Sequence, residues 1–514
     1  MTGIIKHKYS DFHVHEIDKY GVVQYLTSLD PLPLPPYPEG YEEWLASKDI
    51  FFTFKPDTDD QVSRIYYEQP NIEITLTRDE CTLERTLKRR IRPLVTSFVL
   101  CKENLNQPQV ISFLSKKTGK PKRNIGFSGT KDKRGITTQV VTIKEVPISR
   151  LQEIAPTLGD SIKIGQYKQV INPISLGDNQ GNRFTLLIRD VKIPENASLK
   201  SGIERRLLAL EENGFLNYFG MQRFGTGKIP THQYGIHILR QEWDELIKIF
   251  ITPQEGELES THKAKLIYQR THDPVLTLQA LPKSAQSEIS IFKAMSELPK
   301  DKQLKNPCEL FKRIDRRQRM MYVHAYQSYL WNHILTQRWK KYGNEIVEGD
   351  YVQTKEGEII QITNNNRNNF SIFDVVIKLP SKDEMSCEMI ELMAKDNVTP
   401  KMFNDLASEY GAGGDWRKIL IKPLDLEWEL ISHNNLDDLL IDSDMDRING
   451  ITNVNNRVEN GKYNSLVISF SLGSGQYATM CLRELLKRST EWFTDSNMSK
   501  PEKESFWKNF CDIS

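Results

Sequence analysis

The chain has few cysteines, no long apolar run and almost no net charge. Its six cysteines, at positions 81, 101, 308, 387, 481 and 511 of 514 residues, include no Cys-x-x-Cys pair, so their spacing indicates neither a zinc site nor a disulfide framework. No apolar run approaches the roughly 20 residues that cross a bilayer. Residues 1–8 contain no apolar signal core. We therefore expect an intracellular protein of two or three domains, with reduced thiols and no membrane segment.

The near-neutral total charge of +1 hides an uneven distribution. Residues 81–134 hold 14 Lys and Arg against three acids, whereas residues 425–446 hold eight acids and no Lys or Arg. A basic stretch in a neutral chain favours a surface that binds a polyanion, and a solvated helix surface is the alternative. The cations that we expect to contact such a backbone are Lys116, Lys117, Lys120, Lys122 and Arg123.

One stretch of this basic region combines glycines, cations and a single carboxylate. Residues 124–127 and 136–143 have the apolar and β-branched character of two strands. The turn between them carries Asp132, flanked by Lys131, Lys133 and Arg134, and its glycines permit a tight backbone path. Nearby cations favour the ionised form of a carboxylate, and a rigidly held carboxylate can act as nucleophile or base. A solvated hairpin tip with an incidental aspartate is the alternative.

Alternation along residues 9–17 predicts a strand with two different faces. Phe12, Val14 and Glu16 share one face, and Asp11, His13 and His15 share the other. His13 and His15 have the spacing of metal ligands, but no third ligand is identifiable. We therefore interpret the histidines as lying on an exposed strand face and expect no metal ion.

Other elements follow from local patterns. Asn106 can cap a helix that begins near Pro108 and ends at Gly119. Strands are expected at 65–76, 162–172 and 183–190, a helix at 198–213, and surface insertions at the Pro-rich 30–60 and the acidic, Asn-rich 433–462. In Gly181-Asn-Arg-Phe184, Asn182 can read a base edge and Phe184 can stack on a base, with a buried strand as the alternative.

Several of these strings resemble a known family in the same order along the chain. Gly126-Phe-Ser-Gly-Thr-Lys-Asp-Lys-Arg-Gly-Ile-Thr-Thr-Gln139 resembles the signature of the TruD family of pseudouridine synthases. Asp11-Phe-His-Val-His-Glu16, Gly181-Asn-Arg-Phe184, Asn217-Tyr-Phe-Gly-Met-Gln-Arg-Phe-Gly225 and the 473–485 stretch are similar to further family motifs. The resemblance implies that Asp132 is catalytic and that Lys6 approaches it. It also implies that Phe12, Asn182, Phe184 and Tyr477 contact the target nucleoside. Gly473 departs from the family, which commonly has proline there.

The resemblance, to the eukaryotic branch of the family, also implies a fold and an activity. The fold would be α/β (α+β) with a mixed, largely antiparallel sheet. A catalytic domain of residues 1–213 plus 422–514 would be interrupted by a TruD-type α/β domain at 214–421. The enzyme would detach uracil from ribose in RNA, turn it and rejoin it through carbon 5, without a cofactor. We expect a monomer in the nucleus, the cytoplasm or both, acting on tRNA first and on spliceosomal, ribosomal or messenger RNA as further candidates.

Two other classes compete with this interpretation. Ser128-Gly-Thr-Lys131 together with Lys117-Thr-Gly119 is similar to a serine acyl-transfer enzyme, but there the Lys-Thr-Gly element should follow the serine. A catalytically inert RNA-binding protein or RNA chaperone of the same fold is the second alternative. The presence of Asp132, Lys6 and Asn182 argues against it.

Overall fold

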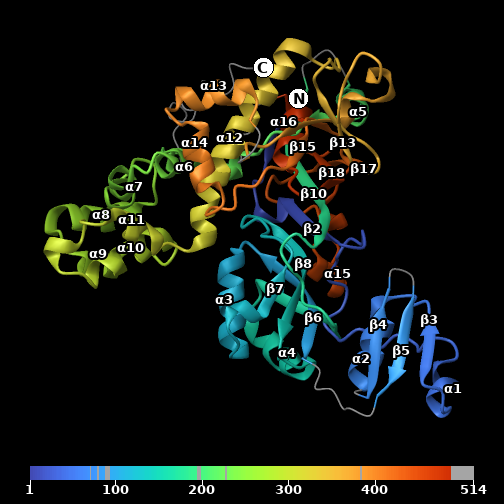
Figure 1. Ribbon diagram of the computed structural model, residues 1–514. Helices are drawn as coiled ribbons and strands as arrows, with labels where there is room; N and C mark the ends of the chain where they lie inside the picture. The colour runs from blue at the N-terminus through green and yellow to red at the C-terminus, as the bar shows by residue number, and fades with distance from the viewer. Residues whose placement is uncertain are drawn as a thin grey trace. The chain divides into compact units, whose positions relative to one another are not determined.

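The computed structural model describes residues 1–69, 71–77, 80–86, 93–193, 198–225, 228–381 and 385–487, and Figure 1 labels their elements. The chain forms two compact units. Unit 1 comprises Met1–Glu211 and Pro423–Gln476, and unit 2 comprises Glu212–Lys422 and the described residues from Tyr477 onward. The predicted domains break the chain near the same two places, but the predicted catalytic domain continues to residue 514, whereas unit 1 ends at Gln476. The assignment of functional domains therefore stays a prediction.

A nine-stranded sheet forms the centre of unit 1 within the described residues. Its order is β17-β18-β10-β2-β8-β6-β9, with β1 paired to β10 and β7 paired to β8. The β2–β8 pair is parallel and the other pairs are antiparallel, which confirms the mixed, largely antiparallel sheet that we expected. The strands are β1 Thr2–Ile5, β2 Phe12–Asp18, β6 Val95–Glu103, β7 Ile125–Phe127, β8 Ile136–Lys144, β9 Ile162–Gln169, β10 Asn179–Lys192, β17 Leu424–His433 and β18 Tyr463–Gly473.

The register of the strands sorts their side chains onto two faces. Asn182 pairs with Glu16 and Phe184 with Val14, so that these residues share one face, which we call face A. The helices α3 (Gln107–Thr118) and α4 (Ile148–Ile154) pack on face A through a core that includes Phe98. The opposite side, face B, carries His13, His15, Thr138 and Glu103 among others.

The helices of unit 1 confirm two predictions. Helix α3 starts after its N-cap Asn106 and ends at Gly119, whose positive φ of 70° suits glycine. The Gln109 side chain accepts a hydrogen bond from the Asn106 N–H at 3.4 Å, which satisfies one of the free donors at the helix start. Helix α5 spans Leu199–Asn213, where the sequence predicted a helix.

The predicted strand at 65–76 is wrong in its first part. Residues Asp59–Glu68 form helix α2, and only Ile72–Leu76 form strand β4. Val62 and Ile65 are both buried, which is the i, i+3 spacing of a helix face and is hard to separate from strand alternation in a short run.

The segment around α2 forms a small folded module with a sheet of its own (Figure 1). Its three-stranded sheet has the order β3-β5-β4, with β3 Phe51–Phe54 and β5 Cys81–Arg85. Helix α1 (Tyr41–Ala46) contributes Tyr41 and Trp44 to the core of this module. Much of the expected 30–60 insertion is therefore integrated into a core of its own.

The expectation that His13 and His15 are exposed is wrong, because part of the 433–462 segment covers face B. The His15 ring and Asp444 of helix α15 (Asp444–Ile448) lie 3.0 Å apart, and Thr138 donates to the same carboxylate at 2.7 Å. Burial lowers the pKa of His13 to about 4, which keeps the ring neutral at pH 7. No group of three His, Cys, Asp or Glu side chains in the described part of the chain is placed to hold a metal ion.

Unit 2 is mainly helical around α12 (Arg316–Tyr342), which contributes Tyr326 and Leu330 to a large apolar core. A four-stranded sheet has the order β13-β12-β14-β15, and β11 pairs with β16. No described helix is long and apolar enough to cross a membrane. The other elements are β11 Phe215–Leu216, α6 Thr231–Leu239, α7 Trp243–Ile251, α8 Glu259–Thr271, α9 Pro274–Ala280, α10 Gln286–Ser296, α11 Pro307–Lys312, β12 Tyr351–Gln353, β13 Ile359–Gln361, β14 Val375–Lys378, α13 Cys387–Lys395, α14 Pro400–Ala407, β15 Trp416–Lys418, β16 Leu420–Ile421 and α16 Ala478–Leu486.

Candidate active site

The turn that carries Asp132 is fixed by its two flanking strands and by a close approach to β2. Strands β7 and β8, which the sequence predicted on either side of the turn, pair with each other. A Cβ atom on Gly135 would lie 2.6 Å from the carbonyl oxygen of Phe12, closer than real atoms pack. Any other residue at position 135 would therefore push the turn away from β2. Glycine is needed here because of this close contact and not because of an unusual φ angle.

A buried ion pair anchors the turn to the sheet. The Lys131 ammonium lies 2.6 Å from the Glu16 carboxylate, and both side chains are almost fully inaccessible. The buried Ser128 hydroxyl also donates to Glu16. A buried charge needs such partners, so removal of either ion would leave the other uncompensated. The Ser128–Lys131 pair is thereby occupied in anchoring Glu16, which removes the structural basis for a serine acyl-transfer enzyme.

Asp132 itself forms an ion pair with Lys6. The Lys6 Nζ lies 3.2 Å from Asp132 Oδ2, with 10% of the lysine side chain and 40% of the aspartate side chain exposed. Strand β1 places Lys6 by pairing Ile5 with Ile188 of β10. The backbone of Lys6 has a φ of 51°, a strained conformation that clusters at functional sites. The Asp132 carboxylate is therefore accessible, while its cationic partner is nearly enclosed.

A second lysine, not predicted from the sequence, supports the backbone of the turn. The Lys102 Nζ donates to the carbonyl oxygens of Asp132 at 2.7 Å and Leu105 at 2.9 Å. Desolvation lowers the pKa of Lys102 to about 8. The available signal was a single cation near the end of the largely buried β6 strand. Lys131, in contrast, was predicted as a neighbour of Asp132 but turns to Glu16.

Aromatic rings form an apolar wall next to the Lys6–Asp132 pair. The Lys6 Nζ lies 3.5 Å from the centroid of the Phe12 ring, within range of a cation–π interaction. The Phe12 and Phe184 rings meet edge to face with centroids 6.1 Å apart, and Phe470 lies 5.7 Å from Phe184. Phe12 and Phe184 are both buried, so they form an apolar wall of the site and are not exposed stacking platforms.

Asn182 lies on the same face of β10 as Phe184 and offers an unused acceptor. Its Oδ1 atom is buried and accepts no hydrogen bond among the described residues. Buried polar atoms are nearly always paired, so an orphaned one calls for an explanation. An amide oxygen in this position can accept a hydrogen bond from an N–H group of a ligand.

Two sets of predicted residues are not brought to the Asp132 turn by the described contacts. Tyr477 belongs to unit 2, where its ring lies 6.2 Å from that of Phe219, and its contact with the target nucleoside stays a prediction. Lys116 and Lys117 lie in the last turn of α3, and Lys120 pairs with Glu145 at 2.9 Å. Lys122 and Arg123 are exposed, while the basic residues within 87–92 lie outside the described residues.

The site thus contains four chemical features: one accessible carboxylate, one enclosed ammonium, an apolar wall and a free amide acceptor. A carboxylate beside a fixed cation can attack an electrophilic carbon or remove a proton. The wall and the amide acceptor suit a flat ring that carries an N–H donor.

Comparison with known proteins agrees with this geometry. The family model described as "tRNA pseudouridine synthase D (TruD)" matches residues 79–485. The pseudouridylate synthase 7 homolog of Homo sapiens is 30% identical over 95% of this chain and 79% of its own length. The multisubstrate pseudouridine synthase 7 of Schizosaccharomyces pombe is 31% identical over 76% of this chain and 62% of its own length.

A solved structure supports the fold. A crystal structure from Methanosarcina mazei, described as a tRNA pseudouridine synthase D, superposes with a TM-score of 0.55 at 20% identity, over 95% of this chain and 94% of that one. The family resemblance inferred from the motifs is thereby confirmed: the chain belongs to the TruD family and is a pseudouridine synthase that acts on RNA.

Proposed function

We propose that the chain isomerises uridines in tRNA, with Asp132 as the nucleophile or base and Lys6 as its cationic partner. The observation that carries this proposal is the Lys6–Asp132 ion pair beside the Phe12 wall and the free Asn182 acceptor. The description of the matching family model names tRNA. The Schizosaccharomyces pombe relative is described as multisubstrate, which supports more than one substrate. Spliceosomal, ribosomal and messenger RNA are the further candidates.

Each residue has a defined part in the proposed reaction. The target uridine leaves its stack and enters the site, at a cost of roughly a few kcal/mol. Asn182 Oδ1 accepts the N3–H group of uracil, and Phe184 contacts the ring. Asp132 then attacks the sugar or removes a proton, while Lys6 keeps a positive charge beside the carboxylate. The uracil turns and rejoins the ribose through carbon 5, so that no atom is gained or lost and no cofactor is consumed.

The RNA class is tested by direct conversion. Purified protein is incubated separately with an unmodified tRNA pool, a spliceosomal RNA, a ribosomal RNA fragment and a messenger RNA, and pseudouridine is located by a chemical stop specific for it. We expect conversion in tRNA at defined positions. Conversion confined to another RNA class would refute the tRNA assignment, and binding without conversion of any RNA would favour an inert RNA-binding protein.

We further propose a monomer in the nucleus, the cytoplasm or both.

RNA affinity should depend on the exposed cations near the end of α3. Lys116, Lys122 and Arg123 are exposed. Changing all three to Glu should weaken binding to every RNA alike. The slope of log affinity against log salt should also fall by about 2, since each single-strand phosphate contact contributes roughly 0.7. Filter binding from low to high salt measures both quantities.

A charge-matched control keeps this prediction specific. Lys263, Lys305 and Lys312 of unit 2 are exposed lysines that already pair with acids. The same triple change to Glu at these positions should leave the salt slope unchanged. Equal losses in both triple variants would mean that net charge, rather than the α3 cations, governs affinity.

Asn182 and Phe184 should matter more for turnover than for RNA affinity. We expect Asn182→Ala and Phe184→Leu each to lower the rate at saturating tRNA by about tenfold or more, because each loses a contact made to one extracted nucleotide. Leucine is chosen because Phe184 is buried and alanine would leave a cavity. Thr185→Ala, one residue away on the other face of β10, is the matched control. Normal turnover in both test variants would make this strand purely structural.

A further inference from the structure

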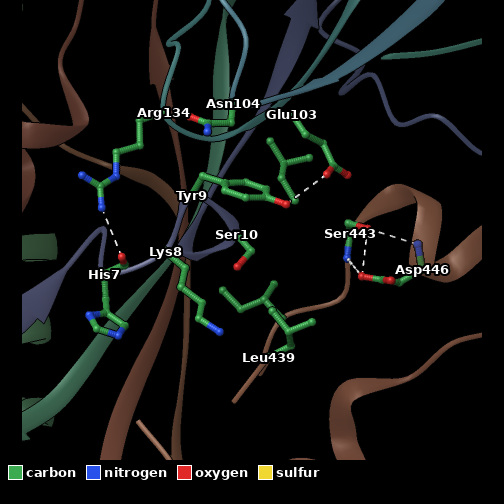
Figure 2. A pocket seen from close by; sticks show the side chains of 12 residues that line it. His7, Lys8, Tyr9, Ser10, Glu103, Asn104, Arg134, Leu439, Ser443 and Asp446 are labelled. Carbon is green, nitrogen blue, oxygen red and sulfur yellow. Dashed lines mark hydrogen bonds between the residues drawn. The ribbon is translucent and has the colours of Figure 1, made fainter. Parts of the chain in front are cut away.

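A cavity of about 680 Å³ lies beside the Asp132 turn in unit 1, within the size range of ligand pockets. It is lined by the residues that follow β1, by the end of β6, by the start of β8 and by the 439–446 segment (Figure 2). None of the residues assigned above to the reaction lines it. The cavity is therefore distinct from the Asp132 site on the same unit.

The cavity shares its walls with the catalytic turn. Arg134, two residues after Asp132, lines it and donates to the His7 carbonyl oxygen at 3.1 Å. Lys102 and Glu103 are successive residues of β6, so their side chains point to opposite faces. Lys102 holds the Asp132 carbonyl, and Glu103 lines the cavity. A chain that passes around this end of the sheet can therefore occupy both sites at once.

The two sides of the cavity differ in charge. Lys8 and Arg134 supply cationic groups, and in Figure 2 Arg134 lies on the opposite side of the view from Asp446. Burial and the nearby Asp446 raise the pKa of Glu103. The Glu103 carboxylate accepts one long hydrogen bond, from the Tyr9 hydroxyl at 3.5 Å, among the described residues. Most of its acceptor capacity is thus open to a ligand with N–H donors.

An exposed aromatic ring stands between these groups. Tyr9 lines the cavity, is 38% exposed and, as Figure 2 shows, turns its hydroxyl toward Glu103. Leu439 and Ile441 add apolar surface to the wall. A ring, an apolar wall, a carboxylate and a cation together match one nucleotide, whose base stacks, whose amino group donates and whose phosphate is anionic.

We propose that this cavity binds the base of an RNA nucleotide that flanks the target uridine, and that it selects a base with an exocyclic amino group. The amino group of adenine, guanine or cytosine donates to Glu103 while Tyr9 stacks on the ring. Uracil places carbonyl oxygens at its edge beside Glu103 and Asp446, which repel them. Arg134 and Lys8 meet the adjoining phosphates. The proposal rests on the proposed function only in requiring that the chain converts uridine in RNA.

The test uses single-turnover conversion of short RNAs, each with one target uridine and with A, G, C or U placed in turn at each of the two positions on either side. For the full-length wild-type protein we expect one flanking position at which amino-bearing bases are converted about tenfold faster than uracil. Tyr9→Ala and Glu103→Ala should reduce that preference to about twofold or less at this position alone. Tyr9→Phe keeps the ring and should retain most of the preference.

Controls separate this inference from the proposed function. Tyr20 is an exposed tyrosine of unit 1 outside the cavity, and Tyr20→Ala should keep the wild-type profile. A wild-type protein that converts none of the RNAs overturns both proposals. A wild-type protein that converts them, with variants that keep its preference or slow all RNAs equally, overturns the cavity assignment alone. Thermal melting detects a variant that fails to fold. Because two independent variants are measured, the test still works if one of them does not fold.

Discussion

Asp132→Asn should abolish turnover and leave the fold and the RNA affinity nearly intact. The amide keeps the shape of the side chain but loses both nucleophilicity and basicity, so we expect a loss of at least about a thousandfold in rate at saturating RNA. The lost ion pair to Lys6 involves a side chain that is 40% exposed, so its contribution to the free energy of unfolding is about 1 kcal/mol or less. Single-turnover kinetics, RNA binding and thermal melting measure the three quantities.

A matched change shows that the effect is local. Asp160, in a loop of unit 1, is an exposed aspartate that lies 3.4 Å from the ammonium of Lys163. Asp160→Asn removes a comparable surface pair and should keep wild-type turnover. A rate for Asp132→Asn within tenfold of wild type would exclude this carboxylate as the catalytic group.

Lys6→Met should lower turnover by about a hundredfold, in the range seen when one charge-stabilising donor is removed from an active site. Methionine keeps the bulk of the stem but loses the ammonium that lies 3.2 Å from Asp132 and 3.5 Å from the Phe12 ring centroid. RNA affinity should change little, because Lys6 is nearly enclosed. Lys6→Arg keeps a positive charge and should recover part of the lost rate.

The N-terminal position of Lys6 calls for its own control. Lys19 is an exposed lysine just after β2, and Lys19→Met should behave as wild type. Deleting residues 1–8 should impair turnover at least as much as Lys6→Met, since it also removes β1 from the sheet. Wild-type rates in the deletion would show that these residues are a dispensable tail.

Local patterns were enough to predict the turn that carries Asp132. The strands on either side of it and helix α3 with its caps depend on residues close in sequence, and each is found within a few residues of its predicted bounds. The pairing of Lys6 with Asp132 came from the family resemblance instead. Spacing alone cannot report that residues 126 positions apart meet.

The wrong or missed predictions concern features that mostly depend on tertiary contacts. Alternation separated His13 and His15 from Phe12 correctly, but it could not show that a segment with Asp444 covers their face. The Lys102–Asp132 and Glu16–Lys131 contacts were missed for the same reason, since each joins residues far apart in the sequence. The first part of the predicted 65–76 strand is a helix instead, because a short apolar run fits both the helical and the strand period.

The strand order of unit 1 has a consequence for how the chain folds during synthesis. Residue 5 pairs with residue 188, and residue 184 pairs with residue 470, so that β10 joins strands that are far apart in the sequence. Strand β1 is made before β10, which is its partner among the described strands, and β10 then waits for β18. Such long-range pairing makes folding slow and leaves strand edges exposed in the meantime. A nascent chain arrested before residue 463 should therefore expose one edge of β10 and depend on chaperones.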